Sequence, residues 1–260
     1  MNPLDQPVAR ERAVVTGATS GIGRAIAVRL AQRGAIVGVL GRNAERAQLV
    51  ADEVSSAGGV PWIGICDVND PESIDAAIAD FVACHGGIDT AVSSAGIALA
   101  GTLAQTSVAN WHAIMNTNLN GTFYFAKSVM PELIKARGTF TAISSDAGVQ
   151  GACGYVAYCA AKHALHGLIK CLALDHGRDG VRANAVCPSF VETPMADQLL
   201  AETSPEELEH YKNAVPIGRF ARPDEVAAAV AHLSSSEASY VNGLMYKIDG
   251  GSTAGYYLNI

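Results

Sequence analysis

The chain has 260 residues, a formal net charge of −7 and no local basic cluster, which argues against nucleic acid or an anionic membrane as a partner. Charged residues make up 17% and hydrophobic residues 49% of the chain, and so few charges suggest apolar surface that an oligomer interface could cover. The six cysteines form no C-x-x-C pair, which favours reduced thiols. No apolar run approaches the roughly 18 residues that span a bilayer, and residues 1–6 lack a signal-peptide pattern, so we expect a cytoplasmic protein.

Short β-branched runs alternate with longer amphipathic segments, which is typical of βαβ units and a parallel sheet. In chain order, we expect strands at 13–15, 36–40, 61–66, 90–93, 139–144, 182–186 and 246–248, and helices at 23–33, 44–57, 73–84, 107–136, 156–177 and 224–233. Continuous apolar strands suit a sheet covered on both faces. The predicted fold class is α/β, with a single doubly wound parallel sheet of the Rossmann type, in one domain over residues 1–260.

One stretch interrupts this alternation. Residues 195–216 are polar and charged and lie between a strand and the next helix. We expect a small helical excursion over the carboxyl ends of the strands, where ligands bind in open α/β sheets. Such a segment is predicted to act as a substrate lid; a solvated helical insertion without a role is the alternative.

Tyr158 and Lys162 lie four residues apart in a predicted helix, and Ser145 stands thirteen residues upstream. This spacing stacks two side chains on one helix face, so the ammonium can lie beside the phenol. A free tyrosine loses its proton near pH ~10, and a nearby cation would lower that pKa towards neutrality. Ser145 could hold the oxygen whose proton Tyr158 takes or returns. The three residues predict a proton-transfer site for an alcohol or a carbonyl, although the spacing alone also fits a surface pair.

A glycine-rich turn, residues 16–23, follows the first predicted strand and opens the first helix. Glycines at this junction allow a tight turn and a close approach of the backbone to a ligand, and the free N–H groups of the helix N-terminus suit a pyrophosphate. The spacing is G-x-x-x-G-x-G rather than the common G-x-G-x-x-G. The turn predicts a dinucleotide cofactor.

Together these motifs resemble the short-chain dehydrogenase/reductase family over about residues 10–252. The matching motifs are Thr16-Gly17-x-x-x-Gly21-Ile22-Gly23, Asp67-Val68, Asn118-Leu119-x-Gly121, Ile143-Ser144-Ser145, Tyr158-x-x-x-Lys162, Asn184-Ala185-Val186-x-Pro188, Pro216-Ile217-Gly218-Arg219-Phe220 and Asp249-Gly250-Gly251. The resemblance implies an NAD(P)(H)-dependent oxidoreductase that interconverts a secondary alcohol and a ketone by hydride transfer.

The resemblance also implies roles for single residues. Tyr158 would be the acid/base, Lys162 would lower its pKa and bind the nicotinamide ribose, and Ser145 would orient the substrate oxygen. Asn118 would support a proton-relaying water. The predicted cofactor-binding set is Gly17, Ser20, Gly21, Ile22, Gly23, Arg42, Asp67, Val68, Ala95, Gly96, Tyr158, Lys162, Pro188, Val191 and Thr193, and the predicted substrate-binding residues are Ser145, Tyr158 and Ser189. No metal site is expected.

Two positions depart from the family pattern. Ser93-Ser94 stands where the family usually has Asn-Asn, and a serine cannot donate and accept as an amide does, so the packing of that strand end is in question. Ser189 stands where glycine is usual after the proline. Its hydroxyl is expected beside the nicotinamide and the substrate.

The choice of dinucleotide depends on the end of the second strand. An acidic residue there would accept from the 2′-hydroxyl of NAD, but this chain has Gly41 followed by Arg42. A guanidinium can pair with the 2′-phosphate of NADP through two charge-assisted hydrogen bonds. We therefore expect NADP to be preferred, with NAD as the alternative if Arg42 stacks over adenine or faces solvent.

Several features keep more than one interpretation. His112, His163 and His166 lack the partners of a metal site and are expected to be structural or on the surface. Cys153 and Cys159 could be reactive thiols near the pocket, but ordinary packing is the stronger reading. Asp146 could equally face the pocket mouth or solvent.

The apolar tail, residues 253–260, suggests a subunit interface. The resemblance implies a homotetramer built on the helix before Thr139 and the helix of Tyr158. Two rival functions stay open: a reductase of 3-oxoacyl groups on acyl carrier protein or CoA, for which Lys127, Lys135 and Arg137 are modest docking candidates, and a cofactor-sensing module without turnover. Substrate identity does not follow from the fold or from these residues.

Overall fold

The computed structural model describes residues 10–201 and 203–255. Seven strands form one parallel sheet in the order β3-β2-β1-β4-β5-β6-β7. Their bounds are β1 Arg12–Thr16, β2 Ile36–Gly41, β3 Val60–Ile65, β4 Thr90–Ser93, β5 Thr139–Ile143, β6 Arg182–Pro188 and β7 Met245–Ile248. The strand order reverses direction between β1 and β4, which opens a crevice at the carboxyl ends of these strands. The doubly wound α/β fold predicted from the sequence is confirmed.

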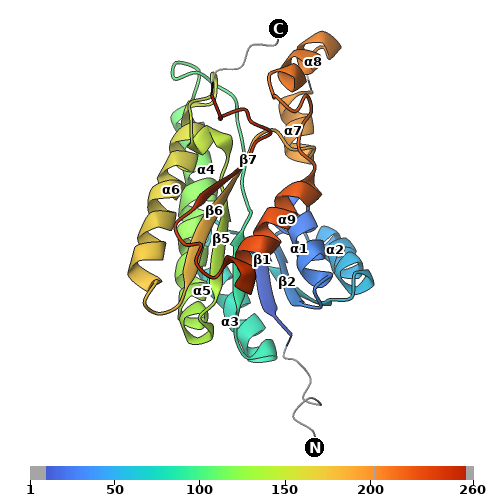
Figure 1. Ribbon diagram of the computed structural model, residues 1–260, viewed down its shortest axis with the longest axis vertical. Helices are drawn as coiled ribbons and strands as arrows, with labels where there is room; N and C mark the ends of the chain where they lie inside the picture. Colours follow the sequence, from blue (N-terminus) through green and yellow to red (C-terminus); the bar gives the residue numbers. More distant parts are fainter. Residues whose placement is uncertain (1–9, 202, 256–260) are drawn as a thin grey trace, which may run out of the picture.

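Helices cover both faces of the sheet. They are α1 Gly21–Ala31, α2 Ala44–Ser56, α3 Pro71–His85, α4 Val108–Met115, α5 Gly121–Ala136, α6 Val156–His176, α7 Pro194–Leu199, α8 Pro205–Asn213 and α9 Pro223–Ser234. One apolar cluster joins α1, α2 and α9 to the sheet, and a second joins α3, α5 and α6 to the opposite face. Figure 1 shows these two helical layers, with α7 and α8 standing beyond the sheet at its carboxyl end.

The strands are apolar on both faces because both are covered. All five residues of β5 are buried, as are four of the five in β1. Fully buried aromatic side chains, Phe81 of α3, Phe125 of α5 and Phe140 of β5, fill the second layer. No helix of the described residues is long and apolar enough to cross a membrane.

The helix predicted over residues 107–136 is wrong in one respect. A π-helical turn, Asn116–Asn120, separates α4 from α5. The amide of Asn118 explains the interruption, because its Oδ1 accepts from Ile97 N at 2.9 Å and its Nδ2 donates to Ile97 O at 2.8 Å. Such turns are frequent at functional sites, and this one rests on a contact that helical periodicity does not report.

The segment 195–216 forms the two short helices α7 and α8, as its composition predicted. Thr193 caps α7 by accepting from Ala196 N, and Ser204 and Glu207 form a reciprocal capping box on α8. The aromatic ring of Tyr211 on α8 lies 5.8 Å from that of Phe190, which also stacks on Phe220 at 5.3 Å. These contacts tie the excursion to the loop after β6.

Candidate active site

A cavity of about 530 Å³ opens at the carboxyl ends of the strands. It is lined by seventeen of the eighteen predicted site residues: Gly17, Ser20, Gly21, Ile22, Gly23, Arg42, Asp67, Val68, Ala95, Gly96, Ser145, Tyr158, Lys162, Pro188, Ser189, Val191 and Thr193. Asn118, the eighteenth, is fully buried and contacts the lining through Ile97 and Gly96. The fold thus gathers into one site residues that are dispersed over most of the sequence.

The glycine turn lies in close contact with its surroundings. A Cβ at Gly17, which has a φ of +64°, would lie 2.7 Å from Ala95 Cα, and one at Gly23 would lie 2.2 Å from the carbonyl oxygen of Gly17. Any other residue would therefore push the turn away from β4 or α1 away from the turn. Ser20, the N-cap of α1, makes no side-chain cap hydrogen bond, and the first turn of α1 holds no acidic residue. The first N–H groups of α1 thus remain available to an anion.

Tyr158 lies in the first turn of α6, three residues after the N-cap Tyr155. The surrounding protein displaces water from its ring, and this burial raises the pKa of Tyr158 to about 12. The Ser145 hydroxyl opposes this shift, and the carboxylate of Asp146 adds to it. A raised pKa keeps the proton on the phenol at neutral pH.

Lys162 lies one turn further along α6 and is buried. Its Nζ donates to Ile143 O at 2.8 Å and lies 5.5 Å from the centre of the Tyr158 ring. Burial lowers the pKa of Lys162 to about 8, so this ammonium loses its proton more readily than that of a free lysine. Burial is the largest influence on the pKa of Tyr158 in this structure, so the effect of Lys162 on that pKa stays a prediction.

Ser145 follows β5 and caps a short 3₁₀ turn, Asp146–Gly148. Its Oγ donates to Asp146 Oδ1 at 2.8 Å and accepts from Ala147 N at 3.2 Å. Asp146 is half-buried and lines the cavity. Of the two interpretations left open for Asp146, the structure selects the pocket.

The end of the cavity beside β2 and α2 holds the predicted residues Arg42 and Asp67 and one arginine, Arg46, that the sequence analysis missed. Arg42 Nη1 lies 3.7 Å from Asp67 Oδ2, and Arg46, one turn into α2, also lines the cavity. A Cβ at Gly41 would lie 2.6 Å from Thr19 Cγ2, so Thr19 occupies the space that an acidic side chain would need. The spacing of four residues between Arg42 and Arg46, across the N-cap of α2, is the signal that could have revealed Arg46.

Other hydrogen bonds hold the end of β4, where Ser93-Ser94 replaces the usual Asn-Asn of the family. Ser93 is buried, and its hydroxyl shares a hydrogen bond of 2.9 Å with Thr122 of α5. The backbone N–H of Ser94 donates to Thr16 Oγ1 at 3.1 Å. The strand end is therefore anchored to α5 and to the glycine turn without the usual amides.

His166 lies beneath the site rather than in it. Its Nε2 is 2.9 Å from Ser144 Oγ and 3.5 Å from Cys187 Sγ, and burial lowers its pKa to about 4. Cys153 and Cys159 do not line the cavity; Cys159 Sγ accepts from Ala152 N at 3.2 Å. Within residues 10–201 and 203–255, no group of three or more His, Cys, Asp and Glu side chains could hold a metal ion.

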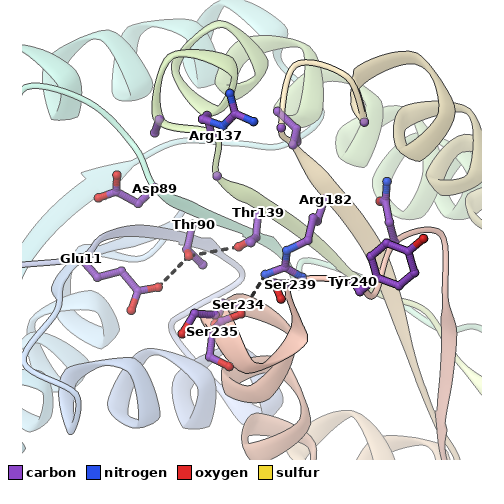
Figure 2. Close-up of a pocket in the computed structure, with 17 residues that line it drawn as sticks. Glu11, Asp89, Thr90, Arg137, Thr139, Arg182, Ser234, Ser235, Ser239 and Tyr240 are labelled. Carbon is purple, nitrogen blue, oxygen red and sulfur yellow. Dashed lines mark hydrogen bonds between the residues drawn. The ribbon is translucent and has the colours of Figure 1, made fainter.

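A second cavity, of about 730 Å³, lies at the opposite edge of the sheet, where β4, β5 and β6 begin. Figure 2 shows Thr90 between Glu11 and Thr139, and Arg182 beside Ser235. Thr90 Oγ1 lies 2.7 Å from Glu11 Oε1 and 3.1 Å from Thr139 Oγ1, and Arg182 Nη2 donates to Ser235 O at 3.0 Å. No tyrosine–lysine pair lines it, so it lacks the combination of Tyr158 and Lys162 found in the first cavity.

Comparison with known proteins agrees with this geometry. The family described as "Enoyl-(Acyl carrier protein) reductase" matches residues 17–253. A short-chain type dehydrogenase/reductase from Mycobacterium marinum superposes with a TM-score of 0.89 at 30% identity, covering 94% of this chain and 96% of that one. The chain belongs to the short-chain dehydrogenase/reductase family.

Two further members show the range of the family. Meso-2,3-butanediol dehydrogenase from Serratia marcescens is 37% identical over 93% of this chain and 94% of its own length. A structure of actinorhodin polyketide ketoreductase with NADPH has a TM-score of 0.88 at 35% identity, covering 94% of this chain and 97% of that one. This short-chain dehydrogenase/reductase is an NAD(P)-dependent enzyme that interconverts a secondary alcohol and a ketone.

The cavity fits a nicotinamide dinucleotide. The glycine turn packs closely against Ala95, and the uncapped N-terminus of α1 has free N–H donors that suit a pyrophosphate. At the other end, a Cβ at Gly96 would lie 2.9 Å from Asn118 Oδ1 and 3.8 Å from Lys162 Nζ. The cavity thus runs from the N-terminus of α1 to Lys162 of α6 and also reaches Arg42.

Proposed function

We propose that Tyr158 is the acid/base of this enzyme and that Ser145 and Lys162 position the reacting oxygen and the cofactor. The observation that carries the proposal is that Ser145, Tyr158 and Lys162, from β5 and α6, line the same cavity as the glycine turn of α1. The second cavity described above has neither a buried ammonium nor the glycine turn of α1 among its lining residues. This arrangement supplies position and electrostatics to a cofactor that performs the difficult step.

The bound nicotinamide would supply or accept the hydride. In ketone reduction, the Tyr158 hydroxyl donates its proton to the substrate oxygen as negative charge develops there; in alcohol oxidation, the phenolate takes that proton. The raised pKa of Tyr158 favours the donor form. Ser145 Oγ holds the same oxygen beside the phenol.

Lys162 and Asn118 support this step by positioning the cofactor and the loop beside it. Lys162 Nζ has one fixed acceptor, Ile143 O, and an ammonium has further protons for the ribose hydroxyls of the cofactor. Asn118 binds both main-chain groups of Ile97, which fixes the loop that borders the nicotinamide ribose. We assign Asn118 to holding this loop and to supporting a proton-relaying water, rather than to direct contact with substrate.

Cofactor preference follows from Arg42 and Arg46. Two guanidinium groups and no acidic residue at position 41 favour the 2′-phosphate of NADP over the hydroxyl of NAD. Asp67, which pairs with Arg42 at 3.7 Å, orients the guanidinium when no phosphate is bound. The solved relative with NADPH is consistent with this assignment.

For the substrate we propose a small secondary alcohol or ketone under a lid formed by residues 195–216. The alternative, a 3-oxoacyl thioester on a carrier protein or CoA, has support from the ketoreductase relative. The basic residues suggested for carrier docking do not favour it: Lys135 pairs with Glu132 at 2.6 Å, Arg137 lines the cavity at the far edge of the sheet, and Lys127 does not line the cofactor cavity. A cytoplasmic location stays a prediction.

A homotetramer is also proposed. Phe123 on α5 and Leu174 on α6 are 47% and 81% exposed, and exposed apolar side chains on these two helices suit the interface that the family resemblance implies. Most of the apolar tail invoked for a second interface, residues 256–260, lies outside the described residues.

The test of the acid/base assignment is Tyr158→Phe, which removes the transferable proton and little volume. We expect kcat to fall by roughly 10²–10⁴-fold, while cofactor binding, followed by fluorescence, stays near the wild-type value. Tyr240→Phe is the matched control, because Tyr240 is fully exposed and lines the other cavity. A Tyr158→Phe enzyme that kept rates within a few-fold of wild type would refute the assignment.

A further inference from the structure

A histidine of α6, His166, spans the gap between this helix and the end of β5. Its Nε2 lies 2.9 Å from Ser144 Oγ and 3.5 Å from Cys187 Sγ of β6. Ser144 is buried, and its backbone N–H donates to Val186 O at 2.7 Å. The imidazole therefore joins α6 to two neighbouring strands, although His166 itself does not line the cavity.

The hydrogen bonds around Ser144 show how the imidazole is held. Burial lowers the pKa of His166 to about 4, so the ring is neutral near neutral pH and carries one N–H. With that proton on Nε2, the ring donates to Ser144 Oγ, and the Ser144 hydroxyl donates to Lys162 O at 3.4 Å. With the proton on Nδ1, two acceptors would compete for the one hydroxyl proton of Ser144. The Nε2–H form of the ring thus satisfies both contacts.

The turn that follows β5 leaves the space for this contact. Gly148 ends the 3₁₀ turn, and a Cβ there would lie 2.8 Å from His166 Nε2 and 2.9 Å from Ser144 Oγ. The φ angle of Gly148 is not in the left-handed region, so the backbone conformation alone does not call for glycine. The close approach of the imidazole and the hydroxyl does.

The same face of α6 carries the proposed acid/base residues. Tyr158, Lys162 and His166 are spaced four residues apart, so they lie on three successive turns of one helix face. Lys162 Nζ donates to Ile143 O at 2.8 Å, and Ser145 lines the cavity with Tyr158. This face of α6 is thus set against consecutive residues at the end of β5. A change of about 1 Å in the separation of such segments can cost ~10²-fold in rate.

We propose that His166 is a positioning residue for the reaction, because its hydrogen bond to Ser144 sets the distance between α6 and the end of β5. That distance governs how Ser145 is aligned with Tyr158. The proposal rests on the function proposed above and adds a residue that acts on the site from below the cavity. Loss of the hydrogen bond should lower kcat while leaving KM for the cofactor nearly unchanged, since the glycine turn lies on the other side of the cavity.

The experiment compares His166→Gln, whose amide can reach Ser144 as Nε2 does, with His166→Leu, which keeps apolar volume and no hydrogen-bonding group. Turnover is followed by cofactor-linked absorbance over a panel of secondary alcohols and ketones. His166→Leu should lower kcat by roughly 10- to 100-fold and change KM for the cofactor by less than about twofold. His166→Gln should keep kcat within about threefold of wild type. His232→Leu, at an exposed histidine of α9, is the control and should leave kcat unchanged.

A second variant tests the hydrogen bond from its other end. Ser144→Ala removes the same contact, so kcat of the double variant Ser144→Ala/His166→Leu should be no lower than that of the more impaired single variant. Thermal melts and cofactor binding confirm that each variant is folded.

The outcomes separate this role from the proposed function. Equal losses of kcat in His166→Gln and His166→Leu, or a loss confined to KM, would assign His166 to packing and overturn the proposal. Losses that multiply in the double variant would overturn it too, because Ser144 and His166 would then act separately. A wild type that turns over no member of the panel would contradict the proposed function and, with it, this role.

Discussion

Removing Arg42 and Arg46 should convert an NADP-preferring enzyme into one with little preference. Hydrogen bonds to charged groups are worth about 1.5–3 kcal/mol, and exposed ion pairs about 0.2–1 kcal/mol. The Arg42 side chain is 71% exposed, and its guanidinium also pairs with Asp67 at 3.7 Å. The free energy that it contributes to NADP binding therefore lies near the range for exposed ion pairs. We take about 1 kcal/mol for each arginine, which gives about 2 kcal/mol together, or roughly 30-fold in the ratio of kcat/KM for NADP to that for NAD.

The assay measures kcat/KM for both cofactors in wild type, Arg42→Ala, Arg46→Ala and the double variant. Each single change should lower the NADP/NAD ratio about fivefold, and raising the salt concentration should lower the wild-type ratio, because exposed charges are screened. Arg178→Ala, at an exposed arginine between α6 and β6, is the control. An Asp at position 41 is a poor test, since its Cβ would lie 2.6 Å from Thr19 Cγ2. A wild-type preference for NAD above about tenfold, or an unchanged ratio in the double variant, would refute the reasoning.

Two further outcomes test the site and the assembly. Burial raises the pKa of Tyr158 to about 12, so kcat/KM for alcohol oxidation should increase with pH as the phenolate population grows. For ketone reduction, kcat/KM should stay level near neutrality and fall at high pH. An oxidation rate that is flat between neutral and alkaline pH would contradict the assigned base. Replacing both Phe123 and Leu174 by Asp should lower the sedimenting mass, since charges at a buried apolar interface are costly. Leu49→Asp, at a 64% exposed position on α2, should leave the sedimenting mass unchanged. A wild type that sediments as a monomer at micromolar concentration would refute the proposed tetramer.

The proximity of Tyr158 to Lys162 and the glycine turn could be predicted from the sequence because their geometry is local. Four residues on a helix place Tyr158 and Lys162 on one face whatever the rest of the chain does. The glycines at 17, 21 and 23 mark a turn at the junction of β1 and α1, and the alternation of apolar runs indicates a covered parallel sheet. Order and spacing along the chain sufficed to predict the fold and most of the residues that line the cavity.

Tertiary structure decided the features that depend on segments distant in sequence. The π-helical turn at Asn118 exists because its amide reaches Ile97, twenty-one residues earlier, and helical periodicity does not report such a contact. The side chain of Thr19 closes the space at Gly41 from another loop.

The electrostatics of the site were also beyond the sequence. A spacing shows which charges can meet, but not how much water the fold removes around them. Lys162 therefore appeared from the sequence as a cation that would lower the pKa of Tyr158, whereas burial raises the pKa of the phenol and lowers that of the ammonium. Asp146 could have faced solvent or the pocket until the 3₁₀ turn after β5 placed its carboxylate against Ser145 Oγ. Residue types and local spacing determined the chemistry available to this protein, and only the packing of distant segments determined the solvation and the direction of each group that performs it.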